Sequence, residues 1–293
     1  MTQIVDSLAA IAPRYTAVFC DLWGCLHNGR EPFAAAVAAL RAFKAQGGTV
    51  LLLTNSPRPK PSVVAQLDRI GVPRDVWDEI VSSGDATQIA LAQGAIGPRV
   101  HHIGAAKDES FFTDYPSEIA EEMQAVTRVP MDQADGILCT GLADDTVETP
   151  ADYRAKLLMG KTLGLTLLCA NPDLIVDLGE TRLYCAGALA AEYEAMGGKT
   201  LYFGKPHPPI YDLARRKLAE MTGSDDHCIL CIGDGIGTDI RGAAGEGLDA
   251  LFVTGGIAAA EFGDDPAHPD PSRLKVWLAA QALSPDYAIG LLR

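Results

Sequence analysis

Ionisable and hydroxyl side chains lie just beyond four short apolar runs of the sequence, 17–20, 49–53, 201–203 and 228–232. These side chains are Asp21, Thr54, Lys205, Asp234 and Asp239. A carboxylate can attack phosphorus, and further carboxylates can hold the hard cation that neutralises phosphate oxygens. A lysine and a hydroxyl can bind the remaining oxygens. An aspartate after a strand is usually a turn or cap residue, but these groups in this order predict phosphoryl-transfer chemistry.

Strand-length apolar runs alternate along the chain with stretches of helical spacing. The apolar runs are 17–20, 49–53, 136–139, 165–169, 228–232 and 250–253. The helical stretches are 34–46, 60–70, 85–93, 151–163, 211–221 and 273–282. This alternation predicts an α/β fold, a parallel sheet with helices on both faces. Because ligands bind beyond the carboxyl ends of such strands, we expect the reactive side chains to meet there.

These motifs resemble those of the haloacid dehalogenase (HAD) superfamily, and particularly its subfamily IIA, the sugar-phosphate, phosphoglycolate and nitrophenyl phosphatase-like proteins. Asp21 matches the first Asp of motif one, D-x-D-x-T, and Thr54 matches motif two. Lys205, in the run Phe-Gly-Lys-Pro, matches motif three. Residues 233–239 match motif four, GDxxxTD. The resemblance covers nearly the whole chain.

The resemblance implies a Rossmann-like core with a parallel sheet, and an α/β cap domain inserted into it. The core would comprise residues 1–83 and 200–293, and the cap residues 84–199. The Asn-Pro-Asp run at 171–173 resembles a recurring motif of such caps. We expect the cap to close over Asp21, so that its opening gates access of the substrate.

The resemblance also implies a reaction and a metal site. Asp21 would attack the phosphoryl group and form an aspartyl-phosphate. Mg²⁺ would be held by the Asp21 carboxylate, the backbone carbonyl of Trp23 and Asp234, with Asp239 in support.

Substrate binding would fall to the second and third motifs of the same family. Thr54, Asn55 and Lys205 would bind the phosphorylated substrate, and Lys205 would also act in catalysis by neutralising Asp21. The resemblance therefore implies a hydrolase, in particular a phosphatase, acting on a small phosphorylated metabolite.

Motif one departs from the family pattern at position 23. The sequence reads D-L-W-G-C, so Trp23 replaces the second Asp, which in phosphatases protonates the leaving oxygen and later activates water. Indole can do neither, because its N–H does not ionise usefully. General acid–base help is worth about 10²–10⁴ in rate. We therefore expect the rate of hydrolysis to fall most for esters with poor leaving groups, such as sugar alkoxides. We also expect the aspartyl-phosphate to accumulate.

Three side chains near the motifs could carry the missing proton. His27 lies four positions beyond the tryptophan, and His207 follows the motif-three lysine by two positions. An imidazole has a suitable pKa, although a loop histidine bonded to backbone or water is the commoner role. Cys25 is more typical of a packing residue. In the cap, Asp173 and Asp177 fit either a substrate-facing or a turn role.

Composition narrows the choice of partners and of cellular location. With 24 Lys and Arg against 38 Asp and Glu, the formal charge is −14, which disfavours nucleic acid and anionic membrane surfaces as partners. The seven cysteines are odd in number and scattered, which is typical of reduced thiols. The N-terminus lacks a basic signal segment, and no apolar run approaches the ~20 residues of a membrane span. We expect a cytoplasmic protein, and whether it forms a homo-oligomer is left open.

Two other functions fit parts of the pattern. Dehalogenases of the same superfamily carry an aromatic residue at the position of Trp23 and attack carbon without a metal, but Asp234 and Asp239 in the full motif four argue against this. A binding or regulatory protein that keeps the metal–phosphate pocket without turnover also fits the loss of one catalytic Asp. Halide release that survives EDTA would favour the first alternative. Tight binding of a phosphate ester with neither turnover nor a phosphoenzyme would favour the second.

Overall fold

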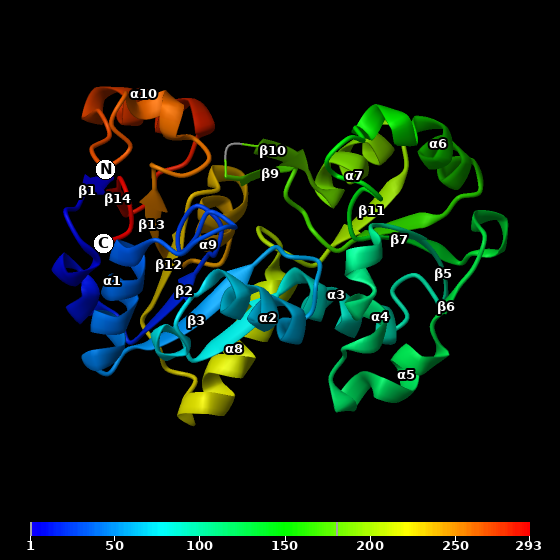
Figure 1. The fold of residues 1–293 in the computed structure, drawn as a ribbon, viewed down its shortest axis with the longest axis horizontal. Coiled ribbons are helices and arrows are strands. Elements are labelled where there is room, and N and C mark those ends of the chain that lie inside the picture. Colours follow the sequence, from blue (N-terminus) through cyan, green and yellow to red (C-terminus); the bar gives the residue numbers. More distant parts are fainter. Residues whose placement is uncertain (1, 180) are drawn as a thin grey trace.

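Two parallel β-sheets lie side by side in the computed structural model, which describes residues 2–179 and 181–293 (Figure 1). The larger sheet has seven strands in the order β1-β14-β13-β12-β2-β3-β4, and every neighbouring pair is parallel. Its strands are β1 (Gln3–Ile4), β2 (Ala17–Cys20), β3 (Thr49–Thr54), β4 (Glu79–Ser82), β12 (Ile229–Gly233), β13 (Asp249–Val253) and β14 (Tyr287–Ile289). This arrangement confirms the predicted α/β fold with a parallel sheet.

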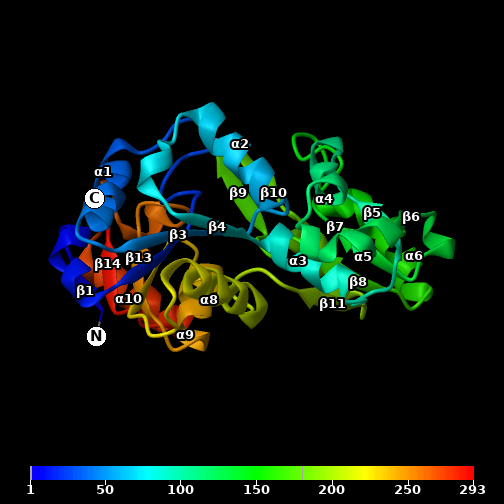
Figure 2. The ribbon, with the colours of Figure 1, turned by 90° about the horizontal axis from the view of Figure 1, so that it is seen from below.

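Helices cover both faces of the seven-stranded sheet, as Figure 2 shows. The helices of one face are α1 (Ala34–Ala45) and α2 (Lys60–Ile70). Those of the other face are α8 (Pro208–Thr222), α9 (Arg241–Gly245) and α10 (Pro271–Gln281). Alternate residues of each strand point to opposite faces of the sheet, so each strand contributes side chains to two hydrophobic cores.

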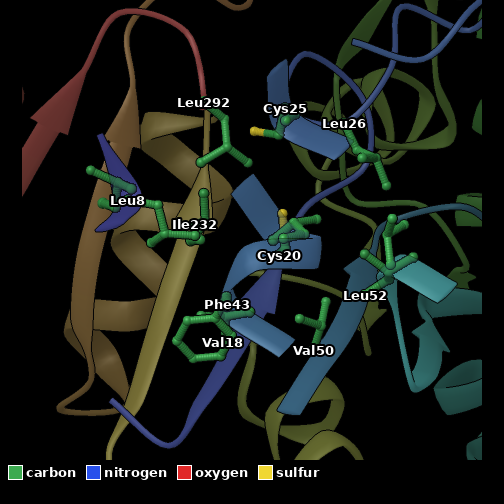
Figure 3. Packing of buried hydrophobic residues seen from close by; sticks show 14 of the residues in the cluster. Leu8, Val18, Cys20, Cys25, Leu26, Phe43, Val50, Leu52, Ile232 and Leu292 are labelled. Carbon is green, nitrogen blue, oxygen red and sulfur yellow. The ribbon is translucent and has the colours of Figure 1, made fainter. Parts of the chain in front are cut away.

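The core on the α1 side shows this alternation directly. Val18 of β2 and Val50 of β3 are fully buried there, and Phe43 of α1 packs against them (Figure 3). Their sequence neighbours Phe19 and Leu51 are buried in the opposite core, under α8. Because both faces are apolar, the strands read as continuous hydrophobic runs, which is why the sequence revealed them.

The second sheet has five parallel strands in the order β11-β8-β7-β5-β6. They are β5 (Arg99–Ile103), β6 (Thr127–Arg128), β7 (Gly136–Cys139), β8 (Thr166–Cys169) and β11 (Lys199–Tyr202). The helices of this region are α3 (Ser83–Ala92), α4 (Ser110–Thr113), α5 (Ala120–Ala125), α6 (Arg154–Thr162) and α7 (Ala186–Ala195). An antiparallel hairpin of β9 (Ile175–Leu178) and β10 (Thr181–Tyr184) lies between the two sheets in Figure 1.

Short helical turns complete the structure. The 3₁₀ turns are Leu8–Ala10, Ala12–Arg14, Arg74–Val76, Ala106–Asp108, Ser117–Ile119, Met131–Gln133, Pro150–Tyr153 and Ala259–Phe262, and Ile236–Ile240 is a π-helical turn. Among the helices of the described residues, none combines the length and the apolar character needed to cross a bilayer. The division into a core of residues 1–83 and 200–293 and a cap of residues 84–199 stays a prediction.

Candidate active site

The motif residues lie together in loops at the carboxyl ends of strands. Asp21 directly follows β2, Thr54 ends β3, and Asp234 directly follows β12. Asp239 lies in the π-helical turn that comes next. None of these four residues is more than 9% exposed. The parallel arrangement of β2, β3 and β12 as sheet neighbours therefore places three polar loops at one edge.

Lys205 reaches this site from the other sheet. It lies in the loop between β11 and α8, and β11 pairs with β8 of the five-stranded sheet. Lys205 therefore follows a strand, as the sequence predicted, but this strand belongs to a different sheet from β2, β3 and β12. A loop that joins the two sheets carries the lysine between the aspartates.

The ammonium group of Lys205 binds two carboxylates of the site. Its Nζ donates hydrogen bonds to Asp21 Oδ1 and Asp239 Oδ1, both at 2.6 Å, and to the carbonyl of Leu53 at 2.9 Å. Burial alone would lower the pKa of Lys205, but the charges of Asp21 and Asp239 outweigh burial and raise it well above its usual value. The lysine is therefore charged and fixes the orientation of both carboxylates.

Asn55 holds the loop that carries Lys205. Its Oδ1 accepts from the Lys205 backbone N–H at 2.8 Å, and its Nδ2 donates to the Lys205 carbonyl at 3.0 Å and to Asp173 Oδ1 at 2.8 Å. A Cβ at Gly204 would lie 2.6 Å from Asn55 Oδ1, so the close approach of this loop needs glycine. Both ends of the Asn55 amide are thus engaged, which favours a positioning role over the predicted contact with substrate.

Three buried carboxylates share the site with this one ammonium group. Burial, reinforced by the charge of Asp239, raises the pKa of Asp21 to about 7 although Lys205 opposes the shift. Burial and the charges of Asp21 and Asp239 raise the pKa of Asp234 well above its usual value. The excess of negative charge makes a divalent cation a fitting ligand here.

The donor atoms of the site suit a hard cation. Carboxylate oxygens of Asp21 and Asp234 and the thiol of Cys25 lie within 4.8 Å of one another. Burial raises the pKa of the Cys25 thiol well above its usual value, so this sulfur stays protonated and is a poor ligand. The remaining donors are oxygens, which Mg²⁺ prefers.

The ring of Trp23 lies against the loop that follows it and beside the β9–β10 hairpin. A Cβ at Gly29 would lie 2.3 Å from Trp23 Cη2 and 2.8 Å from Leu178 Cδ1, so both side chains converge on this glycine. The Gly179 N–H also donates to the Asn28 carbonyl at 3.1 Å. Trp23 is half-buried and lines the cavity with Asp21. The side chain that replaces the second Asp therefore lies where the hairpin meets motif one.

Neither candidate histidine belongs to the described residues that line the cavity. His27 is fully buried, its Nδ1 accepts from the Gly29 N–H at 3.0 Å, and burial lowers its pKa to about 4. The ring of His207 stacks on Tyr202 with the ring centres 4.9 Å apart, and burial lowers its pKa. Both geometries favour packing roles.

A cavity of about 500 Å³ extends from Asp21 to the β9–β10 hairpin and the loops of the five-stranded sheet. Asp173 lines it, and burial raises the pKa of this carboxyl to about 6 against the opposing effect of Lys205. Asp177 also lines the cavity, but it accepts two hydrogen bonds from Arg182, at 2.8 and 2.9 Å. Asp173 and Asp177 therefore both line the space that a ligand would fill.

The cavity is also lined by five charged residues that the sequence analysis did not predict, because they belong to no recognised motif. They are Arg58, Arg69, Lys107, Asp108 and Asp145. A signal existed for Arg58 alone, because it lies four residues after Thr54 in the same strand-end loop. Arg69 comes from the last turn of α2, and the other three come from loops of the five-stranded sheet. A charged residue at such positions usually indicates only a solvated surface.

Comparison with known families identifies relatives along most of the chain. Residues 18–117 match the family described as haloacid dehalogenase-like hydrolase, and residues 202–274 match the family described as HAD-hydrolase-like. The structure resembles that of a hydrolase of the haloacid dehalogenase-like family from Brucella suis 1330, with a TM-score of 0.85 and 41% sequence identity. That likeness covers 99% of this chain and 100% of the other.

Two curated proteins are similar over nearly the full length at lower identity. D-glycerol 3-phosphate phosphatase of Mycobacterium tuberculosis is 25% identical over 276 residues, which are 92% of this chain and 71% of that protein. 5′-nucleotidase YutF of Bacillus subtilis is 26% identical over 278 residues, which are 90% of this chain and 98% of that protein. Both names describe enzymes that remove a phosphoryl group from a small molecule.

Proposed function

Because this chain belongs to the haloacid dehalogenase-like hydrolase family, we propose that it is a phosphatase acting on a small phosphorylated metabolite. The observation that carries the proposal is the ion-pair cluster in which Lys205 binds Asp21 and Asp239 at the carboxyl edge of the sheet. The names of the two curated relatives support the same reaction class. Further support comes from the cavity of about 500 Å³ that opens onto Asp21, a volume within the usual range for small-molecule sites.

In the proposed reaction Asp21 is the nucleophile. One carboxylate oxygen forms a bond to phosphorus, and the bond from phosphorus to the leaving oxygen breaks. An alkoxide leaving group takes its proton from solvent water, because Trp23 cannot supply one. Water then attacks the phosphorus of the aspartyl-phosphate, which releases phosphate and restores Asp21. Lys205 favours the ionised form of Asp21 that the first step needs.

The other motif residues bind and orient the phosphoryl group. Thr54 lines the cavity, and its Oγ1 accepts from the Ser56 N–H at 3.2 Å, so the hydroxyl proton can be donated to a phosphoryl oxygen. Asp21, the carbonyl of Trp23 and Asp234, supported by Asp239, would hold Mg²⁺, which supplies positive charge against the phosphoryl oxygens. We further propose that residues 84–199 act as the cap over this site.

Phosphate release from p-nitrophenyl phosphate and acetyl phosphate, measured with Mg²⁺ and with EDTA, tests the proposal. Release that requires Mg²⁺ is the expected result. Halide release from a haloacid in the presence of EDTA would show that the protein is a dehalogenase instead of a phosphatase. Binding of phosphate esters by the folded protein without any turnover would indicate a binding protein instead.

Mg²⁺ is expected to raise the melting temperature of the wild-type protein but not that of Asp234→Asn. Bound cation stabilises the folded state by mass action, and the variant lacks one oxygen ligand. In EDTA the variant should melt no lower than the wild type, because one of three clustered buried carboxylates is gone. Asp135→Asn, a change in the Arg99 ion pair of the five-stranded sheet, is the matched control and should keep the full Mg²⁺ shift. Equal shifts in all three proteins would contradict the proposed metal site.

Gly24→Ala is expected to lower activity by a factor on the order of 10². The backbone at Gly24 has φ of +73°, and a Cβ there would lie 2.0 Å from Asp234 Oδ2, so the carboxylate must move. Gly71→Ala is the matched control, because Gly71 has φ of +83° with no atom within 4 Å of its Cβ position. Both variants should lose about 1–2 kcal/mol of stability from backbone strain. Similar activity in the two variants, measured as phosphate release, would show that displacement of Asp234 is unimportant.

A further inference from the structure

The cavity contains a second charged cluster besides the one around Asp21. Its members are Arg58, Arg69, Lys107, Asp108 and Asp145, all of which line the cavity. The charges that act on Arg58 are those of Asp108, Arg69 and Asp145. The cluster brings the β3–α2 loop and helix α2 together with loops of the five-stranded sheet. A ligand whose phosphoryl group lies at Asp21 would extend toward these residues.

Arg58 is held in place by neutral partners. Its Nη2 donates to Gln66 Oε1 at 2.8 Å, and its backbone N–H donates to Ser56 Oγ at 3.3 Å. A Cβ at Gly84 would lie 2.4 Å from the Pro57 carbonyl, so the loop packs directly on the first turn of α3. Within residues 2–179 and 181–293 no carboxylate lies within 4.0 Å of the Arg58 guanidinium. Burial lowers the pKa of Arg58, with a smaller contribution from the charge of Arg69, although the charges of Asp108 and Asp145 oppose the shift. The two acids therefore do not fully compensate the positive charge.

The two acids of the cluster are already engaged. Asp145 pairs with Lys107 at 2.5 Å, and Asp108 accepts from Thr140 Oγ1 at 2.9 Å. Three cations thus face two carboxylates in this part of the cavity. The excess of one positive charge is suited to a ligand group with one negative charge, which favours a carboxylate over a dianionic phosphate.

We propose that Arg58 and Arg69 form an anion subsite that selects phosphate esters whose leaving group carries a carboxylate. The subsite rests on the proposed phosphatase function and assigns the substrate class of that same cavity. A guanidinium binds a carboxylate through two parallel hydrogen bonds, and a desolvated guanidinium gains most from such a pair. Thr54 and Arg58 are four residues apart, so their Cα atoms lie at most about 14 Å from each other. A leaving group of a few carbon atoms fits that span.

The test compares 3-phosphoglycerate with glycerol 3-phosphate. The two esters share the carbon skeleton and the phosphate position, and differ in a carboxylate against a hydroxymethyl group. In the wild type, kcat/KM should be about 10–100-fold higher for 3-phosphoglycerate, the range for a hydrogen bond to a charged group. Arg58→Gln should remove this preference and change kcat/KM for glycerol 3-phosphate and p-nitrophenyl phosphate less than about threefold. Arg69→Gln should act in the same direction.

Arg41→Gln is the matched control, because Arg41 is an exposed residue that pairs with Asp75 and does not belong to the described lining of the cavity. It should leave the preference intact. Equal kcat/KM for the two esters in the wild type would overturn the subsite, as would an equal loss for all three substrates in Arg58→Gln. If p-nitrophenyl phosphate is not hydrolysed at all, the phosphatase proposal fails instead. Calorimetry then tests the subsite separately. Tighter binding of 3-phosphoglycerate than of glycerol 3-phosphate supports the subsite, and equal binding overturns it.

Discussion

Asp21→Asn is expected to lower the rate of phosphate release by a factor on the order of 10⁴ or more, while the protein stays folded. The amide has the size of the carboxylate, and its Oδ1 can still accept from Lys205 Nζ, so packing around this buried position is preserved. An amide oxygen is a far weaker nucleophile than a carboxylate, so the first step of the reaction stops. The measurement is kcat for p-nitrophenyl phosphate at saturating Mg²⁺, beside an unfolding curve.

A matched change elsewhere separates chemistry from stability. Asp135→Asn alters an ion pair with Arg99 in the five-stranded sheet and should keep wild-type kcat. If Asp21→Asn retained more than a tenth of wild-type activity with its fold intact, Asp21 could not be the nucleophile.

Trp23→Asp is expected to raise the rate with glycerol 3-phosphate by about 10²–10⁴, the usual value of general acid–base catalysis. The substitution places a carboxyl group in the cavity next to Asp21, where neither candidate histidine lies among the described lining residues. An alkoxide leaves slowly without a proton, whereas p-nitrophenolate does not need one. The rate with p-nitrophenyl phosphate should therefore change much less.

Trp23→Asn is the control variant, because it removes the indole without introducing an acid. Both variants lose the ring contacts with His27 and Gly29, and they differ in charge and in the ability to carry a proton. If the two variants behave alike with both substrates, the missing acid at position 23 does not limit the reaction. An equal gain for the alkyl and the aryl ester would contradict the account in the same way.

The sequence revealed the central strands and helices because both faces of the large sheet are buried. The runs at 17–20, 49–53, 228–232 and 250–253 became β2, β3, β12 and β13, and the helical stretch 60–70 became α2 with the same ends. Gly71, with φ of +83°, is the C-cap residue of that helix. The edge strands β1 and β6 were missed, because two residues each are too few to show any period.

The sequence predicted which residues form the site better than it predicted how the fold brings them together. Asp21, Thr54 and Asp234 follow apolar strands, a position that marks chemistry in parallel sheets. The sequence could not tell that Lys205 follows a strand of the other sheet, since strand order depends on long-range pairing. Nor could it show that the Asn55 amide binds the Lys205 backbone, or that Arg58 lacks a carboxylate partner among the described residues, because such contacts exist only in the folded chain.

Rapid-quench analysis with ³²P-labelled p-nitrophenyl phosphate shows whether Asp21 forms a covalent intermediate. We expect a burst of labelled protein in the presence of Mg²⁺, with the label on the peptide that contains Asp21. The labelled aspartyl-phosphate should accumulate, because Trp23 cannot activate the water that hydrolyses it. Asp21→Asn should show no label. Phosphate release by the wild type without any covalent label, or with the label on another residue, would show that Asp21 is not the nucleophile.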